Sequence, residues 1–292
     1  MSGLWSHIAG RISELSGTHF SPRAPGRVGG GCINTAVHLS DGRQDWFVKI
    51  NDAARLDMFE AEAAGLNAMA DTHTIRVPRA LCTGSHVDSA YIVMDYIEPG
   101  HARGGGQALA GERLAAMHRH TAGRFGWERD NTIGATHQPN AWRDDWIDFW
   151  REQRLGFQLE LVGRNGYASL QRRGEKLLDC LHVLIDHAPV PSLLHGDLWG
   201  GNIHFDQQGE PVIFDPAVYY GDREADLAMT ELFGGFGRDF HAAYDAAWPR
   251  DDGYRMRKTL YNLYHILNHA NLFGGGYASQ AEGMIDRLLS EC

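Results

Sequence analysis

The sequence has only four cysteines in 292 residues, and no two of them form a CxxC pair or the spacing of a disulfide framework. We therefore expect a protein of the reducing cytoplasm. No apolar run approaches the ~18–20 residues that span a bilayer, and the N-terminal segment lacks the apolar centre of a signal peptide.

Basic residues are also scarce: 27 Lys and Arg stand against 37 Asp and Glu, a net charge of −10. Because such a surface repels phosphate backbones and anionic membranes, we expect neither nucleic acid nor membrane as a partner. The composition leaves the oligomeric state open.

The remaining composition is that of a globular protein, with 43% hydrophobic and 22% charged residues. The first third predicts a helix over residues 1–20, β-segments on either side of a helix at 56–69, and further β-segments up to about residue 97. Beyond it, helical periodicity dominates, at 107–121, 142–163, 168–187, 238–248, 254–273 and 279–290. We therefore expect a bilobal α+β fold, with a β-sheet N-terminal lobe (1–97) and a mostly helical C-terminal lobe (98–292).

Lys49 lies within the apolar β-segment FVKI and needs a partner for its charge. On the helix at 56–69, Glu62 falls in the middle of the apolar face, whereas Glu60 falls on the opposite side. The sequence therefore predicts a Lys49–Glu62 ion pair. Before this strand, Gly29, Gly30 and Gly31 enter a β-hairpin, where glycines allow backbone N–H groups to approach an anion; a plain turn is an equal alternative.

Two further segments, LLHGDLWGGNIHF and PVIFDPA, contain Asp197, Asn202 and Asp215. Asn202 follows Asp197 by five positions, and Asp215 follows Asn202 by thirteen, directly after a short apolar run. This order resembles the catalytic and metal-binding motifs of protein kinases, with Gly196 where arginine is usual. The resemblance implies that Asp197 accepts the proton of the acceptor hydroxyl and that Asn202 and Asp215 bind Mg²⁺. It implies an ATP site formed by the three glycines, Lys49, Glu62, Met94, Asp95 and Ile97.

The sequence is identified more narrowly as a member of the fructosamine kinase (ketosamine-3-kinase) family, which is related to the aminoglycoside phosphotransferases. The segments that carry the resemblance run nearly from end to end and include FGWERDNTIG, HGDLWGGN, DPAVYYGDREADLAM and LYNLYHILNHANLFGGGY. Membership implies phosphorylation by ATP, with Mg²⁺, of the sugar 3-hydroxyl of ketosamines, on free amines or on glycated protein, as a deglycation step. The alternatives are a kinase of another small alcohol, such as an aminoglycoside or a choline-like amine, and a catalytically silent nucleotide-binding regulator.

Several nearby residues receive supporting roles. The resemblance implies that Asp226 holds the backbone of the catalytic loop, and we place His195 beside it as a structural residue. For sugar contact we name aromatic and basic residues near the motifs, although core packing is at least as compatible with each: Trp199, Tyr219, Tyr220 and Arg223.

Cys32 is either a small loop-filling residue or a thiol whose oxidation reversibly disables ATP binding. His265 and His269 have a spacing that could bind zinc, but no neighbouring glutamate completes a motif, and we expect hydrogen-bonding or solvated roles.

Overall fold

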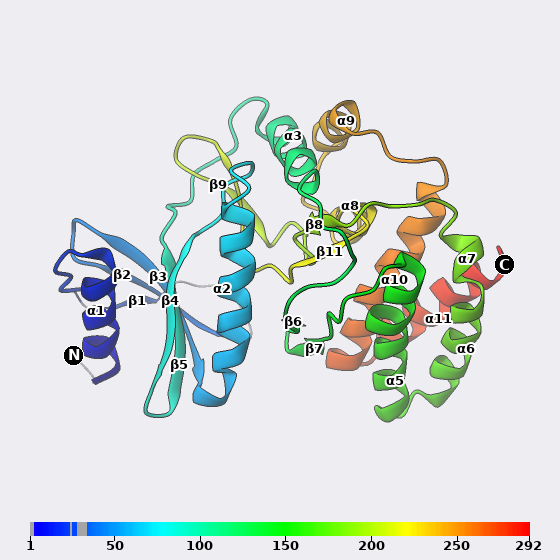
Figure 1. The fold of residues 1–292 in the computed structure, drawn as a ribbon, viewed down its shortest axis with the longest axis horizontal. Helices are drawn as coiled ribbons and strands as arrows, with labels where there is room; N and C mark the ends of the chain where they lie inside the picture. The colour runs from blue at the N-terminus through cyan, green and yellow to red at the C-terminus, as the bar shows by residue number, and fades with distance from the viewer. Residues whose placement is uncertain (1–2, 24, 28–33) are drawn as a thin grey trace.

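The N-terminal part is built around a five-stranded antiparallel sheet in the order β1-β2-β3-β5-β4, as a computed structural model shows (Figure 1). The model describes residues 3–23, 25–27 and 34–292, so the predicted glycine loop (Gly29–Gly31) and Cys32 lie outside the described residues. The strands are β1 (Gly26–Arg27), β2 (Thr35–Ser40), β3 (Asp45–Asp52), β4 (Ala80–His86) and β5 (Ser89–Asp95). Two helices accompany them, α1 (Gly3–Ser16) and α2 (Leu56–Ala70), with a short 3-10 turn at Ala53–Arg55 before α2.

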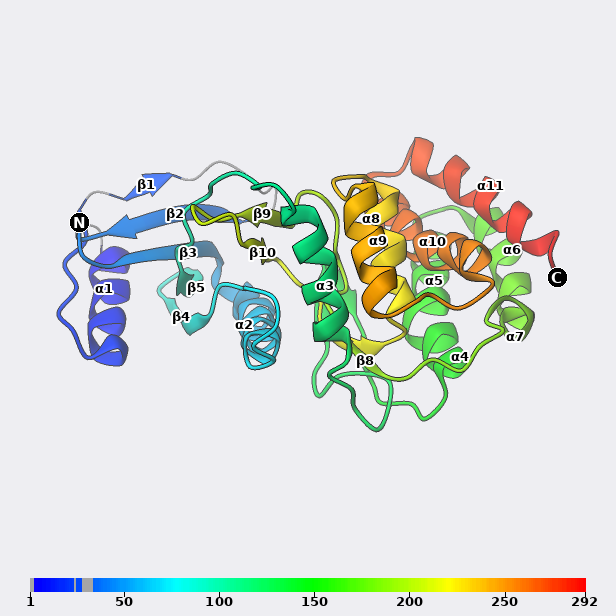
Figure 2. The ribbon, with the colours of Figure 1, turned by 90° about the horizontal axis from the view of Figure 1, so that it is seen from above.

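Helices cover both faces of this sheet, α1 on one side and α2 on the other (Figures 1 and 2). The central strand β5 is therefore apolar on both faces: Tyr91 and Val93 pack with Ile8 and Ile12 of α1, whereas Ile92 and Met94 join the core on the α2 side. Because side chains alternate along a strand, Lys49 of β3 lies on the face toward α2, with Phe47. This alternation places the lysine where Glu62 can reach it.

The rest of the chain is mostly helical and also contains short two-stranded sheets (Figure 2). The helices are α3 (Gly106–His118), α4 (Trp146–Phe149), a π-helical stretch (Trp150–Leu155), α5 (Gly156–Arg164), α6 (Ala168–Asp179), α7 (Leu181–Leu184), α8 (Glu224–Leu232), α9 (Arg238–Ala247), α10 (Tyr254–Phe273) and α11 (Gly276–Leu289). The short strands are β6 (Asn131–Ile133), β7 (Thr136–Gln138), β8 (Ser192–Leu194), β9 (Ile203–Phe205), β10 (Pro211–Ile213) and β11 (Tyr219–Gly221). Within the described residues, no helix combines the length and apolarity that a membrane span requires.

The α+β architecture agrees with the prediction, but several elements differ. Helix α8 and the strand pairs β6–β7 and β8–β11 were not predicted, because three-residue strands and a nine-residue helix give too little periodicity. The helix predicted at 168–187 is broken at Cys180, where the backbone leaves helical geometry between α6 and α7.

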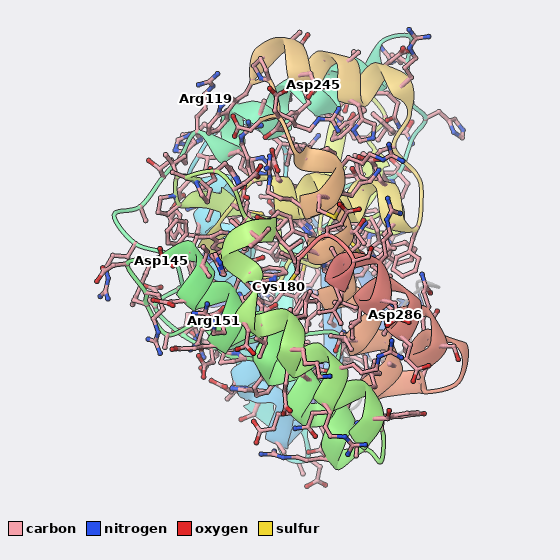
Figure 3. All side chains as sticks on the ribbon, turned by 90° about the vertical axis from the view of Figure 1, so that its right-hand side faces the viewer. Arg119, Asp145, Arg151, Cys180, Asp245 and Asp286 are labelled. Carbon is pink, nitrogen blue, oxygen red and sulfur yellow. A yellow bond between two sulfur atoms is a disulfide. The ribbon has the colours of Figure 1, made fainter. Side chains whose placement is uncertain are left out.

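Two of the four cysteines are paired, although their spacing in the sequence is not that of a disulfide framework. Cys180 and Cys292 form a disulfide across 112 residues of sequence, with their Cα atoms 6.1 Å apart (Figure 3). Helix α11 packs on α6, and this brings the C-terminal residue beside the end of α6. Sequence spacing could not reveal the pair, since only the packing of these helices brings the two residues together.

Reduction of this disulfide should lower stability, because a cross-link over a long loop restricts the unfolded chain. For the Cys292→Ser variant we expect a free energy of unfolding about 2–4 kcal/mol below that of the oxidised wild type. The measurement is urea unfolding with and without dithiothreitol. The reductant should shift the wild-type transition and leave the variant's unchanged; equal transitions for all samples would show that the bond adds no stability.

Candidate active site

A cavity of about 640 Å³ lies where the sheet meets the helical part, and it collects most of the predicted site residues. Its walls include the predicted nucleotide residues of the first third and the predicted catalytic and metal residues of the second part: Lys49, Glu62, Met94, Asp95, Ile97, Asp197, Asn202 and Asp215. Residues from five separate stretches of chain therefore converge on one hollow. The structure places them together, and their roles remain proposals.

Lys49 is buried at the centre of this convergence. Its Nζ lies 2.5 Å from Glu62 Oε1, the predicted ion pair, and 2.5 Å from Asp215 Oδ1. Burial alone would lower the pKa of Lys49, but the charges of Glu62 and Asp215 outweigh burial and raise it. The lysine is thus a fixed cation between the two parts of the molecule. Its direct contact with Asp215 was not specified by the sequence.

The segment before Asp197 is held by a buried carboxylate. Asp226 accepts hydrogen bonds from the backbone N–H groups of His195 (2.7 Å) and Gly196 (2.8 Å). Burial alone would raise the pKa of Asp226, but His118 and these bonds outweigh burial and lower it, so the group is ionised. His195 in turn donates from Nε2 to the carbonyl of Phe214 (2.9 Å), just before Asp215. One carboxylate and one histidine therefore fix the segment before Asp197 against the segment that carries Asp215.

Asp197 is held by Asn202, whose Nδ2 donates to the Asp197 carbonyl (2.9 Å) and carboxylate (3.3 Å). Burial and the nearby charge of Asp215 raise the pKa of Asp197 to about 7. A carboxyl group with a pKa near neutrality can accept a proton from a bound hydroxyl and release it afterwards. Asp197 is thus the candidate for a general base at this cavity.

Asp215 has a left-handed backbone, with φ of +57°, which is uncommon for residues other than glycine. The next part of the loop is fixed by a bond from Ala217 N–H to the His195 carbonyl (2.8 Å). On the other side, Gly196 also has a positive φ, and a Cβ there would lie only 2.1 Å from the Ala217 carbonyl oxygen. The close approach of the two loops explains why glycine, and no residue with a side chain, occupies position 196.

Of the residues predicted to contact adenine or the sugar, some line the cavity and others do not. Met94, Asp95 and Ile97 line the cavity at the end of β5, where the sheet ladder stops at the Trp46–Asp95 pair. The backbone groups after Asp95 are thus not used by the sheet. Trp199 also lines the cavity and has 38% of its surface exposed.

The other three residues named for sugar contact lie away from the cavity, which corrects that expectation. Tyr219 is buried, and the central guanidinium carbon of Arg154 lies over its ring, 3.9 Å from the ring centre. Tyr220 packs among the tryptophans at positions 127 and 142. Arg223 is buried and donates to the carbonyls of Trp248 (3.1 Å) and Pro249 (2.5 Å). None of the three lines the cavity, because their side chains are engaged in these packing contacts instead.

The β6–β7 hairpin supplies a wall of the cavity that sequence reasoning missed. Asn131 lines the cavity and donates to the Val218 carbonyl (2.8 Å), while Gln138 donates to Asn131 Oδ1 (2.7 Å) and the Ala217 carbonyl (3.2 Å). The Tyr264 hydroxyl completes the set by donating to Gln138 Oε1 (2.6 Å). This buried network holds the hairpin against the loop that follows Asp215. The segment FGWERDNTIG contains Asn131, but its letters alone gave no reason to place it at the site.

Replacing Gln138 with leucine should destabilise the protein, because Tyr264 and Asn131 would lose a buried hydrogen-bond partner without gaining water. We expect the free energy of unfolding to fall by about 2–3 kcal/mol. Urea unfolding measures it, with Gln208→Leu, in the exposed turn between β9 and β10, as the control. Equal stability of the Gln138→Leu variant and the wild type would show that this network does not hold the hairpin.

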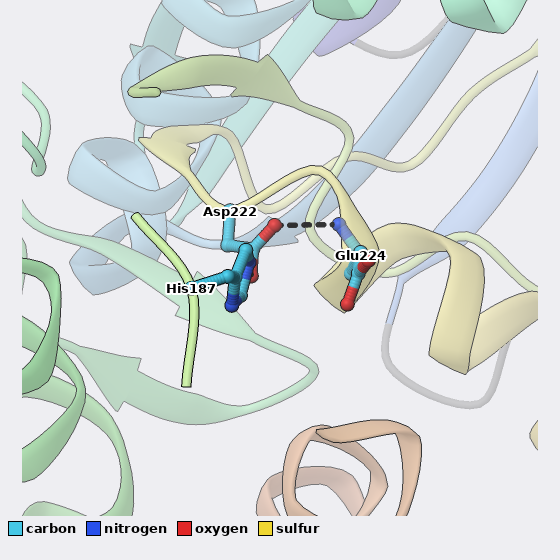
Figure 4. A group of neighbouring side chains, drawn as sticks. All are labelled: His187, Asp222 and Glu224. Atoms are coloured by element: carbon cyan, nitrogen blue, oxygen red, sulfur yellow. Dashed lines mark hydrogen bonds and ion pairs between the residues drawn. The ribbon is translucent and has the colours of Figure 1, made fainter. Parts of the chain in front are cut away.

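One group of possible metal ligands occurs among the described residues outside the cavity, formed by His187, Asp222 and Glu224 (Figure 4). Its oxygens already have partners. Asp222 accepts from the Tyr261 hydroxyl (2.5 Å), and Glu224 accepts from Arg257 through Nε (2.6 Å) and Nη2 (3.1 Å). Because a buried guanidinium lies against the cluster, a cation there would be repelled. We interpret the group as an ion-pair network that supports the start of α8.

Neither His265 nor His269 belongs to a group of three possible metal ligands in the described part of the chain. His269 Nδ1 lies 2.8 Å from the His265 carbonyl and donates to it, and burial lowers the pKa of His265 to about 3. His269 therefore uses its ring to bond the backbone of its own helix, and His265 is a buried, neutral histidine.

Comparison with known proteins gives one consistent answer over the whole chain. The family model described as fructosamine kinase matches residues 4–291. The chain is 49% identical to a probable ketoamine kinase of Synechocystis (98% of this chain, 97% of the relative). It is 47% identical to a chloroplastic protein-ribulosamine 3-kinase of Arabidopsis thaliana (90% and 82%). The crystal structure of a candidate fructosamine-3-kinase from Haemophilus somnus superposes with a TM-score of 0.89 at 28% identity, over 98% of this chain and 97% of that one. The family resemblance and the kinase-like α+β fold inferred from the sequence are both confirmed, and the chain belongs to the fructosamine kinase family.

Proposed function

We propose that this protein transfers the γ-phosphoryl group of ATP to the sugar 3-hydroxyl of a ketosamine. The observation that carries the proposal is the convergence of Lys49, Asp197, Asn202 and Asp215 on one cavity at the junction of the sheet and the helical part. Phosphoryl transfer requires positioning and charge neutralisation more than covalent participation by the protein, and these four groups offer both. The names of the relatives, ketoamine kinase and ribulosamine 3-kinase, support a ketosamine as the acceptor.

Each residue has a role that follows from its surroundings. Lys49, held by Glu62, binds the phosphates as a fixed cation, and the backbone after Asp95 meets the edge of the adenine. Asp197 orients the acceptor hydroxyl and takes its proton at the carboxylate. His195 and Asp226 hold the loop that carries Asp197, so a small movement of either would misplace the base.

The residues present also fit a magnesium ion. The Asp215 carboxylate is 46% exposed. Asn202 uses its amide nitrogen on Asp197, and no residue in the described part of the chain donates to its amide oxygen, which can therefore serve as a ligand. Carboxylate and amide oxygens are the ligands that Mg²⁺ prefers. Asp215 and Asn202 would hold the ion, which supplies positive charge to the phosphates when bound.

Ketosamine-dependent ADP release tests the proposal. The wild type should release ADP when a ribose- or fructose-derived ketosamine is added, and an Asp197→Ala variant should not. A panel that includes an aminoglycoside and choline tests the other small alcohols, which the names of the relatives do not favour. Turnover of only those alcohols would overturn the ketosamine assignment, and nucleotide binding without any turnover would favour the silent regulator.

Trp199 is the sugar contact that we retain, because its ring is exposed at the cavity beside Asp197. Its replacement with alanine should raise the KM for a small ketosamine about tenfold, the effect of losing roughly 1.4 kcal/mol of stacking. The KM for ATP should stay constant. Steady-state kinetics decide the point: an unchanged sugar KM in a stably folded variant removes Trp199 from the acceptor site.

Three other sequence expectations continue as proposals. We place the phosphate-covering loop at Gly29–Gly31, the lobe boundary between residues 97 and 98, and the protein in the cytoplasm. Because disulfides are rare in reducing compartments, we expect Cys180 and Cys292 to be largely reduced in the cytoplasm.

A further inference from the structure

A row of aromatic rings leads away from the cavity across the helical part, and we call it the aromatic strip: Trp199, Phe233, His269, Phe273 and Tyr277. Trp199 meets Phe233 edge-on with ring centres 6.2 Å apart, and Phe233 lies 5.0 Å from His269. His269 then contacts both Phe273 (5.6 Å) and Tyr277 (5.0 Å). The strip thus connects the catalytic loop with the junction of α10 and α11.

Three of the five rings are exposed to solvent, and those of His269 and Tyr277 are half-buried. Trp199, Phe233 and Phe273 are 38%, 39% and 67% exposed, and among the described residues no other tryptophan or phenylalanine is exposed to this degree. Leu272, beside Phe273, is also exposed. Contiguous apolar surface of this kind on a globular protein marks a binding surface more often than isolated exposed residues do.

The strip is continuous with the catalytic cavity. Trp199 belongs to both, two residues after Asp197. The Gly200 N–H donates to the Gly234 carbonyl (3.0 Å), and Gly235 lies so close to Gly200 that a Cβ there would be 2.3 Å from the Gly200 Cα. The loop that carries Phe233 is therefore attached directly to the catalytic loop. A ligand at Asp197 that extended past Trp199 toward Gly234 would therefore meet Phe233.

The segments that carry the strip lack charged residues. Residues 198–205, 232–237 and 259–281 contain no Lys, Arg, Asp or Glu, although charged residues make up 22% of the chain. The surface that they form therefore has no Lys, Arg, Asp or Glu of its own with which to select a charged sequence motif. It fits methylene chains and apolar side chains, and its ring faces attract a cationic amine.

We propose that the aromatic strip binds the polypeptide that carries the ketosamine: the methylene stem of a glycated lysine and the residues beside it. The inference rests on the proposed function, which places the sugar at Asp197. The amine substituent then leaves the cavity past Trp199 and lies over Phe233 and Phe273. A ketosamine on a small amine ends before the strip and makes none of these contacts.

The test compares two acceptors, a peptide with one ribulose-modified lysine flanked by apolar residues and the ribulose adduct of methylamine. The variants are Phe273→Ser and Phe233→Ser, both outside the catalytic groups. The control is Val87→Ser, at a 79% exposed position in the β4–β5 turn of the sheet. We expect kcat/KM for the peptide to fall about tenfold in both strip variants, through KM, and the methylamine adduct to stay within about twofold of wild type.

Other outcomes separate the possible failures. Equal losses for both acceptors, or no loss for either, would overturn the strip proposal. Sedimentation of the wild type and of Phe273→Ser tests a second copy of this chain as the occupant: a dimer that the substitution dissociates, with unchanged kinetics for both acceptors, would also overturn it. If the wild type turns over neither ketosamine, the proposed function itself has failed.

Discussion

An Asp197→Asn enzyme should lose about 10³-fold in kcat with little change in the KM for ATP, the size of effect expected for a general base. The substitution keeps the shape of the side chain and its contact with Asn202, and removes only the ability to take a proton. Steady-state ADP release measures it, with the exposed Asp252→Asn as the matched control. A fall in kcat of less than about tenfold would contradict a proton-accepting role.

The same variant should be more stable than the wild type above neutral pH. Since the pKa of Asp197 is about 7 in the folded protein and about 4 in the unfolded chain, its contribution to stability is present below about pH 4 and lost as pH rises through 7. At pH 8 the wild type carries a half-buried carboxylate beside Asp215, which asparagine avoids. We expect a gain of about 2 kcal/mol in the free energy of unfolding at pH 8 and a smaller gain at pH 5. The same gain at both pH values would show that the Asp197 pKa is not raised.

An Asp215→Asn enzyme should lose about 10²–10³-fold in kcat, because the charge stabilisation removed with one such group amounts to about 3 kcal/mol or more. Binding of ATP without magnesium should survive better than turnover, since Lys49 keeps Glu62 as a partner and loses a competitor for the phosphates. Titration calorimetry with and without Mg²⁺, beside the kinetic assay, measures the two effects.

The choice of asparagine matters because Asp215 has a positive φ. Asparagine adopts this conformation readily, whereas alanine does so at about 1 kcal/mol or more. An Asp215→Ala variant should therefore be less stable than Asp215→Asn at similar activity. Full activity of Asp215→Asn with Mg²⁺ would contradict the assignment of Asp215 as a metal ligand.

Much of the site was predictable because short-range patterns determine it. Helical periodicity on residues 56–69 put Glu62 on the buried face, and the apolar run around Lys49 required a partner, so the ion pair followed from two local observations. Asp197 and Asn202 lie in one loop, and the β9–β10 hairpin connects this loop to Asp215. Because both connections are short and local, the spacing in the sequence is enough to predict that the three side chains lie close together.

The rest depends on packing between distant segments. Cys180 and Cys292 become neighbours only through α6 and α11, and Asn131 reaches the cavity only because Gln138 and Tyr264 hold its hairpin there. Tyr219 and Arg223 have side chains suited to a sugar and follow Asp215 closely in the sequence, but both are buried and neither lines the cavity. The sequence showed that these residues lie close to the motif along the chain, but it could not show whether their side chains point into the cavity or away from it.

The central claim is that a buried lysine, a raised-pKa carboxylate and two oxygen ligands meet to move a phosphoryl group from ATP to a sugar alcohol. Phosphorus–proton correlation NMR of the reaction with a ribulose-derived ketosamine tests it most directly. We predict one new phosphate ester coupled to the proton on sugar carbon 3, formed by the wild type and absent with Asp197→Asn. Free phosphate released at the same rate with and without the ketosamine, and no ester, would contradict the account.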